Sequence, residues 1–408
     1  MKLLIVSQYF WPENFRINDL ALGLKRLGHE VTILTGIPNY PSGRFFPGYN
    51  FFSLRCEEFE GIPVYRVPQI SRGTGKGVRL ALNYISFALF STLLGPLRCR
   101  GDFDAIFVYE PSPITVGLPA LLLKMIKRAP ILFWVQDLWP ESLSATGAIR
   151  TTWILNAVEN LVRVIYRGCD LILVQSRAFI PSVEMLGGKQ IRYFPNSAEA
   201  LYKPVVLPEC APERTAMPAG FRVMFAGSVG TAQDFGTILD ASEILKQHAN
   251  IQWGILGEGR MLPWVKEQIE ARGLNTTVHL LGQHPVESMP GYFSLADVML
   301  VTLRKEPVFA LTIPSKIQSY LACGKPIIAA LDGEGAHIIQ EARAGIAVPA
   351  GDPELLADAV LAMSRMTVAE REAMGVRALQ YFKENFERGM LLERLDGWLR
   401  ELGIKGHQ

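Results

Sequence analysis

The chain has 408 residues, a length that suggests two or three domains. Apolar residues make up 49% and charged residues 20%, which excludes disorder as the main state and allows a large hydrophobic core. Residues 1–198 carry 21 Lys and Arg against 14 Asp and Glu, a net charge of +7, whereas residues 199–408 carry 20 against 25, a net charge of −5. The opposite charges suggest different partners for the two halves, and the lack of a dense Lys/Arg run argues against nucleic acid.

The cysteines and histidines form no recognisable site. Five cysteines are scattered without a CxxC pair, and six histidines form no pair at ligand spacing. This pattern argues against a disulfide framework or structural zinc and is typical of the reducing cytosol. Asp102 and Asp104 form a DxD pair, but they stand in a turn before a strand, where Asp is common, so we expect no metal. The apolar run LLIVS that follows Met1 and Lys2 is too short for a signal peptide.

The first half alternates short apolar runs with helical patterns. Helices are predicted at 18–27, 118–127 and 153–167, and buried strands at 3–10, 30–36, 105–110, 130–137 and 171–176. Short apolar runs separated by helices are typical of parallel βαβ units. The sequence therefore predicts an α/β domain with a doubly wound parallel sheet over residues 1–198.

Leu80–Leu97 is a stretch of 18 residues without a charge. Its length makes it a candidate for a membrane-spanning helix, although polar residues, Gly and Pro dilute it. A buried core helix and a helix that dips into a membrane surface are the other interpretations. Basic residues nearby favour contact with anionic lipid; they are Arg72, Lys76, Arg79, Arg98 and Arg100.

Four prolines within 15 residues indicate an extended linker over residues 199–220. The alternation then restarts and predicts a second doubly wound domain over 221–384. Its strands are predicted at 221–228, 251–257, 278–282, 298–303, 326–331 and 344–349, and its helices at 233–247, 261–272, 286–294, 315–323, 335–342 and 353–364. Residues 368–402 read as one amphipathic helical stretch, and we expect the helix at about 385–408 to pack back on the first domain.

Two loops of the first domain follow predicted strands, where ligands bind in open α/β sheets. The loop after the first strand lacks GxGxxG, and its Asn14 and Arg16 are candidates to contact a phosphate or a sugar hydroxyl. A solvated helix-capping loop is the alternative.

The second of these loops spans residues 135–142 and joins polar groups to an aromatic ring. It carries Gln136, Asp137 and Glu141 beside Trp139. A sugar ring needs an apolar face together with hydrogen-bond partners, and this loop offers both. The alternative is a Pro-containing turn with a buried Trp.

In the second domain, Gly227, Ser228 and Gly230 follow a strand and precede a helix, so a phosphate could approach backbone N–H groups there. Arg260 closes the next strand and is a candidate to pair with a diphosphate.

The segment 304–328 is the strongest local signal. Ser315 is expected to cap a short helix whose N-terminus attracts an anion, and Gly324 to end it. Lys305 and Lys316 add positive charge, and Glu306 stands beside them.

Taken in order, the motifs SQYFWPENFRINDLALGLKRLGHEVTILT, PNYPSG, VQDLWPESL, FAGSVGTAQDF, LGEGR and IPSKIQSYLACGKPII resemble the GT-B glycosyltransferases of family 4 over essentially the full chain. QDLWPES and PSKIQSYLACGKP are most similar to sugar-nucleotide transferases of O-antigen and capsule assembly, including N-acetyl-L-fucosamine transferases.

The resemblance implies two Rossmann-like domains facing a cleft, with a UDP-sugar on the C-terminal domain and the acceptor on the N-terminal one. It implies a retaining reaction that needs neither metal nor cofactor. The sugar would be an N-acetylated amino sugar such as FucNAc or GlcNAc, and the acceptor a polyprenyl-diphosphate-linked glycan. The enzyme would then lie on the cytoplasmic face of the inner membrane as a peripheral protein. The oligomeric state is left open.

The sequence departs from the common family pattern. Many members carry two glutamates seven residues apart, where this chain has Leu311 and Ser319. Ser228 stands near the usual Arg, and Gln136 replaces a frequent His. We therefore infer ribose recognition by Ser319 and neutralisation of the diphosphate by Lys305, Lys316 and Arg260.

The chemistry requires stabilisation of the departing diphosphate, which can itself accept the proton of the acceptor hydroxyl. Asp137 is our first candidate for contact with the acceptor and Glu141 the second. The alternatives are a GT-B UDP-sugar epimerase and a catalytically degenerate nucleotide-sugar-binding subunit.

Overall fold

The structure is a computed structural model that describes residues 1–53, 55–145 and 151–406. Its strands are β1 (Lys2–Ser7), β2 (Glu30–Gly36), β3 (Cys56–Phe59), β4 (Ile62–Val67), β5 (Ala105–Glu110), β6 (Ile131–Val135), β7 (Leu171–Val174), β8 (Ile191–Tyr193), β9 (Phe221–Ala226), β10 (Ile251–Leu256), β11 (Val278–Gly282), β12 (Val298–Thr302), β13 (Ile327–Ala330) and β14 (Gly345–Val348). Its α-helices are α1 (Arg16–Arg26), α2 (Gly77–Arg98), α3 (Gly117–Lys127), α4 (Glu141–Ala145), α5 (Thr152–Gly168), α6 (Ile180–Met185), α7 (Phe235–Ile244), α8 (Leu262–Ala271), α9 (Met289–Leu295), α10 (Pro307–Ala310), α11 (Ser315–Ala322), α12 (Glu334–Glu341), α13 (Pro353–Arg365), α14 (Val368–Asn385) and α15 (Arg388–Gly406).

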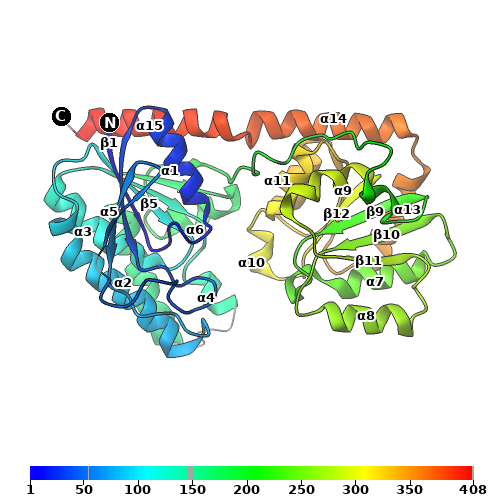
Figure 1. The fold of residues 1–408 in the computed structure, drawn as a ribbon, viewed down its shortest axis with the longest axis horizontal. Coiled ribbons are helices and arrows are strands. Elements are labelled where there is room, and N and C mark those ends of the chain that lie inside the picture. Colours follow the sequence, from blue (N-terminus) through cyan, green and yellow to red (C-terminus); the bar gives the residue numbers. More distant parts are fainter. Residues whose placement is uncertain (54, 146–150, 407–408) are drawn as a thin grey trace. The chain divides into compact units, whose positions relative to one another are not determined.

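The chain divides into two compact units (Figure 1). Unit 1 combines Met1–Phe194 with Leu392–Gln408, and unit 2 is Pro195–Leu391. The segment 199–220, predicted as a linker, lies inside unit 2, where Tyr202 stacks on Phe293 with ring centroids 5.8 Å apart.

Unit 1 holds an eight-stranded sheet in the order β3-β4-β2-β1-β5-β6-β7-β8. All pairs are parallel except β3 with β4. The central strands β1, β5 and β6 are almost entirely buried, as their continuous apolar sequences require when helices cover both faces. Figure 1 shows α2, α3 and α5 side by side, and α1 lies next to α15, where Gly23 leaves room for Leu392.

Helix α2 has a buried face and an exposed face, so the predicted apolar stretch is a helix that unit 1 only half covers. Its buried face contacts β2, β4 and α3. Among the described residues, α2 is the helix that is long and apolar enough to cross a membrane by length and composition.

Unit 2 holds a six-stranded, wholly parallel sheet in the order β11-β10-β9-β12-β13-β14. Its core includes the fully buried Phe225, Trp253, Ile328 and Val360. The two parallel-sheet domains confirm the predicted α/β fold class.

The end of the chain forms two helices, where the sequence predicted one stretch. The carboxylate of Glu387 accepts hydrogen bonds from the backbone N–H groups of Gly389 (2.9 Å) and Met390 (2.7 Å), which starts α15 as a new helix. Residues of α15 from Leu392 onward belong to unit 1, as predicted for the C-terminal helix.

Candidate functional site

Strand ends bring together the polar residues of unit 1. Strands β2 and β5 both pair with β1, so the chain connections diverge there, and ligands bind outside the carboxyl ends of strands at such a point. The loops that follow β1, β2, β4, β5 and β6 all begin at this edge of the sheet.

Glu13 ties the loops after β1 and β2 to one another. Its side chain is buried, and one carboxylate oxygen accepts the backbone N–H groups of Asn39 and Tyr40, each at 2.7 Å. Burial raises the pKa of Glu13 to about 7, and these backbone hydrogen bonds oppose that rise. The carboxyl group of Glu13 therefore holds these two loops together.

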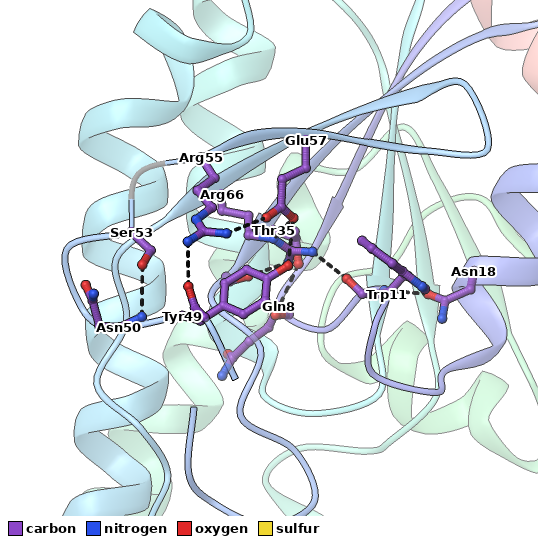
Figure 2. A network of polar contacts seen from close by, with 12 residues as sticks. Gln8, Trp11, Asn18, Thr35, Tyr49, Asn50, Ser53, Arg55, Glu57 and Arg66 are labelled. Carbon is purple, nitrogen blue, oxygen red and sulfur yellow. Dashed lines mark hydrogen bonds and ion pairs between the residues drawn. The ribbon is translucent and has the colours of Figure 1, made fainter. Parts of the chain in front are cut away.

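Arg66 of β4 is hydrogen-bonded to the end of β2 and to the loop after β1 (Figure 2). The guanidinium is fully buried and donates to the Glu57 carboxylate at 2.7 Å, to the Gly36 carbonyl at 3.0 Å and to the Trp11 carbonyl at 2.5 Å. A planar group with five donors suits this task because it can satisfy several acceptors at fixed angles.

Asn83 connects α2 to this edge of the sheet. Its amide nitrogen donates to the Ile70 carbonyl at 2.5 Å, and its oxygen accepts from the Gln8 amide at 2.8 Å. All of these groups are buried or part-buried, so the first turns of α2 are held rigidly beside the loops after β1 and β4.

Three tyrosines surround a cation. The Arg72 guanidinium lies 4.9 Å from the Tyr40 ring centroid and 6.0 Å from that of Tyr9. Burial raises the pKa of Tyr9 and of Tyr84, and the charge of Arg72 acts against both shifts. Within the described residues no carboxylate forms an ion pair with Arg72, so its charge is available to an anionic ligand.

Carboxyl groups gather at the ends of β5 and β6. Glu110 is completely buried, and burial together with the nearby Asp137 raises its pKa well above the usual range. Burial also raises the pKa of Asp137, while a hydrogen bond from the Ser142 hydroxyl to its carboxylate acts in the opposite direction. Asp137 and the Tyr84 hydroxyl interact electrostatically, so the cation and carboxyl clusters are neighbours.

The other predicted residues of unit 1 fall in different places. Asn14 is exposed, and Arg16 is the first residue of α1. The loop is held instead by Asn18, whose amide group bonds the Trp11 N–H at 3.0 Å and the Glu13 carbonyl at 2.7 Å.

In the second predicted loop, Gln136 and Glu141 are half-buried at the end of β6 and the start of α4. The Trp139 ring is 7% exposed and packs edge-on against Tyr84, with centroids 6.3 Å apart. It is therefore the buried Trp of the alternative interpretation, and it offers no open face to a sugar in this structure.

Unit 2 contains a pocket of about 330 Å³ next to the carboxyl end of β9. The Gly227–Ser228 turn, the start of α11, α9 and the segment 199–202 surround it. The residues that line it are Glu199, Tyr202, Ala226, Gly227, Ser228, Met289, Phe293, Ser315, Lys316, Ser319 and Tyr320.

Lys316 supplies the positive charge of this pocket. Burial lowers its pKa to about 8, and its ammonium lies 4.5 Å from the Phe225 ring centroid. A Cβ atom at Gly227 would come within 2.5 Å of Lys316 Cε, so the glycine leaves room for the lysine.

Tyr320 joins α11 to β9 at the base of the pocket. Its hydroxyl donates to the Ala226 carbonyl at 3.1 Å and accepts the Ala226 N–H at 3.0 Å. The Ser319 hydroxyl donates to the Ser315 carbonyl at 3.2 Å, one turn earlier. Ser315 was expected to cap α11, but it is the first helical residue; Pro314 occupies the cap position and no side chain caps the helix.

The loop after β10 packs on the turn after β9. The Val229 N–H donates to the Glu258 carbonyl at 2.8 Å, and Arg260, which is exposed, donates to the Thr231 hydroxyl at 2.5 Å. Gly230 precedes a short 3-10 turn. The Gly-rich motif and Arg260 therefore lie together, because they follow the neighbouring strands β9 and β10.

Lys305 and Glu306 lie in the exposed loop between β12 and α10 and do not line the pocket. Glu199 and Tyr202, which do line it, were missed because the prolines around them predicted a linker. In unit 1 Glu110 was missed, although it ends a buried strand just as Asp137 follows one. Among the residues that the structure describes, no group of three His, Cys, Asp or Glu side chains is placed to hold a metal ion.

Two family models match the chain. One, described as a glycosyl transferase 4-like domain, matches residues 14–197, and the other, described as glycosyl transferases group 1, matches residues 220–365. The probable glycosyltransferase WbjE of Pseudomonas aeruginosa is 25% identical over 332 residues, which are 77% of this chain and 78% of that protein. The putative colanic acid biosynthesis glycosyl transferase WcaI of Escherichia coli K12 is 22% identical over 342 residues, 79% of this chain and 82% of that protein.

A solved structure of HepE (Alr3699) from Anabaena in complex with UDP superposes with a TM-score of 0.69 and 14% identity, covering 98% of this chain and all of that one. This likeness shows that the two parallel-sheet domains are those of the GT-B fold. The family models together match most of the sequence, and the chain therefore belongs to the group 1, family 4-like glycosyltransferases.

Proposed function

We propose that this glycosyltransferase moves a sugar from a UDP-sugar to a polyprenyl-diphosphate-linked glycan during the synthesis of a bacterial surface polysaccharide. The pocket of unit 2 carries the proposal, because it combines a small-residue turn with a half-buried cation at the carboxyl end of a central strand. The name of WcaI, a putative colanic acid biosynthesis glycosyl transferase, supports polysaccharide synthesis, and the UDP bound to HepE supports the nucleotide.

The diphosphate of the donor is proposed to bind between Ser228 and Lys316. The Gly227 and Val229 N–H groups donate to the Leu256 and Glu258 carbonyls, so Ser228, between them, is proposed to contact the diphosphate. The ammonium of Lys316 lies in partly desolvated surroundings, where its attraction to an anion is stronger than in water. Ser319 and Glu199 line the same pocket and are proposed to hold the ribose hydroxyls.

The reaction is proposed to retain the configuration of the sugar and to need no metal. Bond cleavage places negative charge on the departing diphosphate, and Lys316 stabilises that charge in the transition state. The departing phosphate oxygen then accepts the proton of the acceptor hydroxyl, so the enzyme need not provide a nucleophile. The resemblance to N-acetyl-L-fucosamine transferases favours an N-acetylated amino sugar such as FucNAc or GlcNAc.

The acceptor is proposed to bind unit 1 at the carboxyl ends of its strands. Arg72, held among tyrosines and without a carboxylate partner in the described structure, would contact the diphosphate of the lipid-linked glycan. Asp137, whose carboxylate lies next to Tyr84, would orient the acceptor sugar.

A donor panel tests the function. The purified enzyme is incubated with radiolabelled UDP-sugars, a polyprenyl-diphosphate sugar and EDTA, and label is followed into the lipid fraction. We expect one donor to be used, with retention established by NMR of the product. Asp137→Asn should lower kcat at least tenfold, whereas Asp102→Asn, an exposed residue before β5, should not. Saturable UDP binding without transfer from any donor would contradict the proposal and favour a binding subunit.

A further inference from the structure

Helix α2 carries an apolar stripe that unit 1 leaves uncovered. Six of its large apolar side chains are between 43% and 76% exposed and recur every three or four residues, which places them on one face; they are Val78, Leu82, Ile85, Leu89, Leu93 and Leu97. Soluble proteins seldom expose a continuous apolar surface of this kind without a partner for it.

The opposite face of α2 shows that the helix cannot turn the stripe inward. Asn83, Ser86, Phe87, Ser91 and Gly95 are buried against the rest of the unit. The Ser86 hydroxyl accepts the Ile70 N–H at 2.9 Å and donates to the Asn83 carbonyl at 3.0 Å. These polar contacts fix the rotation of α2 about its axis, so the outward orientation of the stripe is built into the fold.

The segment that carries the stripe has charges of one sign, and the exposed Glu60 and Asp102 stand just beyond its two ends. Residues 61–101 contain six Arg and Lys and no Asp or Glu. Lys76 precedes α2 and is exposed, while Arg98 and Arg100 stand at its end. Arg79 is also exposed, and its guanidinium donates to the carbonyl and the hydroxyl of Ser71.

Helix α3, the neighbour of α2, also exposes apolar side chains at its end. The two helices pack on one another, and both begin where a parallel strand ends. Met125 and Ile126, in the last turn of α3, are 77% and 51% exposed, and the exposed Arg128 follows them. Apolar side chains flanked by basic ones at both ends are typical of a helix that lies in the surface of an anionic bilayer.

We propose that α2, over its length of about 33 Å, lies parallel to the plane of an anionic bilayer with its stripe among the lipid head groups and upper acyl chains. The single sign of the charges in residues 61–101 favours lipid over a second copy of this chain, because two copies paired through α2 would bring like charges together. We call the six exposed apolar residues of α2, from Val78 to Leu97, the docking stripe.

Within one turn of α2, residues of the docking stripe alternate with residues that face the proposed acceptor site. Leu82 and Ile85 are exposed, whereas Asn83 and Tyr84, between them, face the loops after β1 and the carboxyl cluster. A diphosphate at the bilayer surface would therefore reach Arg72 and Tyr84 without leaving the membrane. This second step rests on the proposed function; the docking itself does not.

Vesicle sedimentation tests the docking stripe. The purified full chain is mixed with phosphatidylcholine vesicles with or without phosphatidylglycerol. We expect binding to the anionic vesicles, and a loss of at least tenfold in the triple variant Ile85→Ser, Leu89→Ser and Leu93→Ser. The matched control replaces three exposed valines of unit 2, Val206→Ser, Val368→Ser and Val376→Ser, and should bind as the unaltered chain does.

Three outcomes would overturn the inference: no binding of the unaltered chain to anionic vesicles, equal binding by the triple variant, or a dimer in sedimentation equilibrium that the triple variant dissociates. Arg98→Gln with Arg100→Gln should weaken binding only to anionic vesicles. Transfer to a short-chain, water-soluble acceptor separates the two proposals. The triple variant should retain that activity, whereas vesicle binding without any transfer by the unaltered chain would leave docking intact and contradict the proposed function.

Discussion

Lys316 is a cation whose charge changes within the range of ordinary assays. Burial lowers its pKa to about 8, so in the free protein it is an ammonium below that pH and increasingly a neutral amine above it. A diphosphate attracts the ammonium and not the amine. The affinity for UDP should consequently be highest below pH 8 and decline as the pH rises through that value.

The first prediction is a decline of roughly tenfold in UDP affinity between pH 7 and pH 9, because one charge-assisted hydrogen bond to the diphosphate is lost. Isothermal titration calorimetry on the unaltered chain measures it. Lys316→Arg keeps its charge over the whole range and should bind with little pH dependence, and Lys316→Met should bind weakly at every pH. A pH-independent affinity in the unaltered chain would contradict the role given to Lys316.

Sequence position predicted which residues stand near the strand ends but not what their side chains do there. Asp137 and Gly227 followed from the rule that ligands bind beyond the carboxyl ends of parallel strands. Arg72 and Tyr84 did not, because their position depends on how β4 and α2 pack, and neither belongs to a local motif. Trp139 shows the converse. The same residue in the same loop could stack on a sugar or be buried, and only its tertiary contacts, among them the edge-on contact with Tyr84, show that it is buried.

At the scale of elements, strands buried on both faces were predicted closely, since β2 and β5 begin and end where their apolar runs do. The two strands at one end of the sheet, the edge strand β3 and its neighbour β4, were missed. β3 reads Cys-Glu-Glu-Phe and β4 contains Pro63 and Arg66, so neither shows a buried-strand pattern. Pairing between the strands and the part-buried Arg66–Glu57 ion pair stabilise β3 and β4 instead, and contacts with distant parts of the chain are not visible in a single window of sequence.

The loops after β9 and β10 support one another through glycines. Gly257 has φ of +141°, and a Cβ there would lie 2.0 Å from the Gly227 carbonyl oxygen. Gly282 also has positive φ, +75°, but no atom lies within 4 Å of its virtual Cβ. Comparing substitutions at Gly257 and Gly282 therefore distinguishes the cost of a positive φ from the cost of a steric clash with the neighbouring backbone.

The second prediction is that Gly282→Ala destabilises unit 2 by about 1 kcal/mol through strain alone, whereas Gly257→Ala destabilises it by several kcal/mol and also weakens UDP binding. The collision with Gly227 would displace the turn that borders the pocket. Urea denaturation and UDP titration of both variants measure the two effects. Equal stability and equal UDP affinity in the two variants would show that the loops do not depend on this contact.

At the scale of the whole molecule, the last helix completes the first domain. Four leucines of α15 are buried in unit 1, namely Leu392, Leu395, Leu399 and Leu402. Asp396 accepts from His29 at 2.7 Å, and Arg192 pairs with Glu401 at 2.8 Å. Unit 1 therefore includes a segment that follows unit 2 in the chain, and we expect its folding to need that segment.

The third prediction is that a chain ending after Leu391 keeps unit 2 folded and loses unit 1. Burial of a leucine contributes about 1.5–3 kcal/mol, so four of them contribute about as much as the whole stability of a typical domain. Limited proteolysis with mass spectrometry should show cleavage throughout residues 1–194 and protection of unit 2, and UDP should still raise the Tm of the protected part. A chain ending after Ile404, which retains the four leucines, is the control and should resist cleavage in both units. Protection of residues 1–194 in the shorter chain would mean that the parallel sheet of unit 1 is stable without its C-terminal helix.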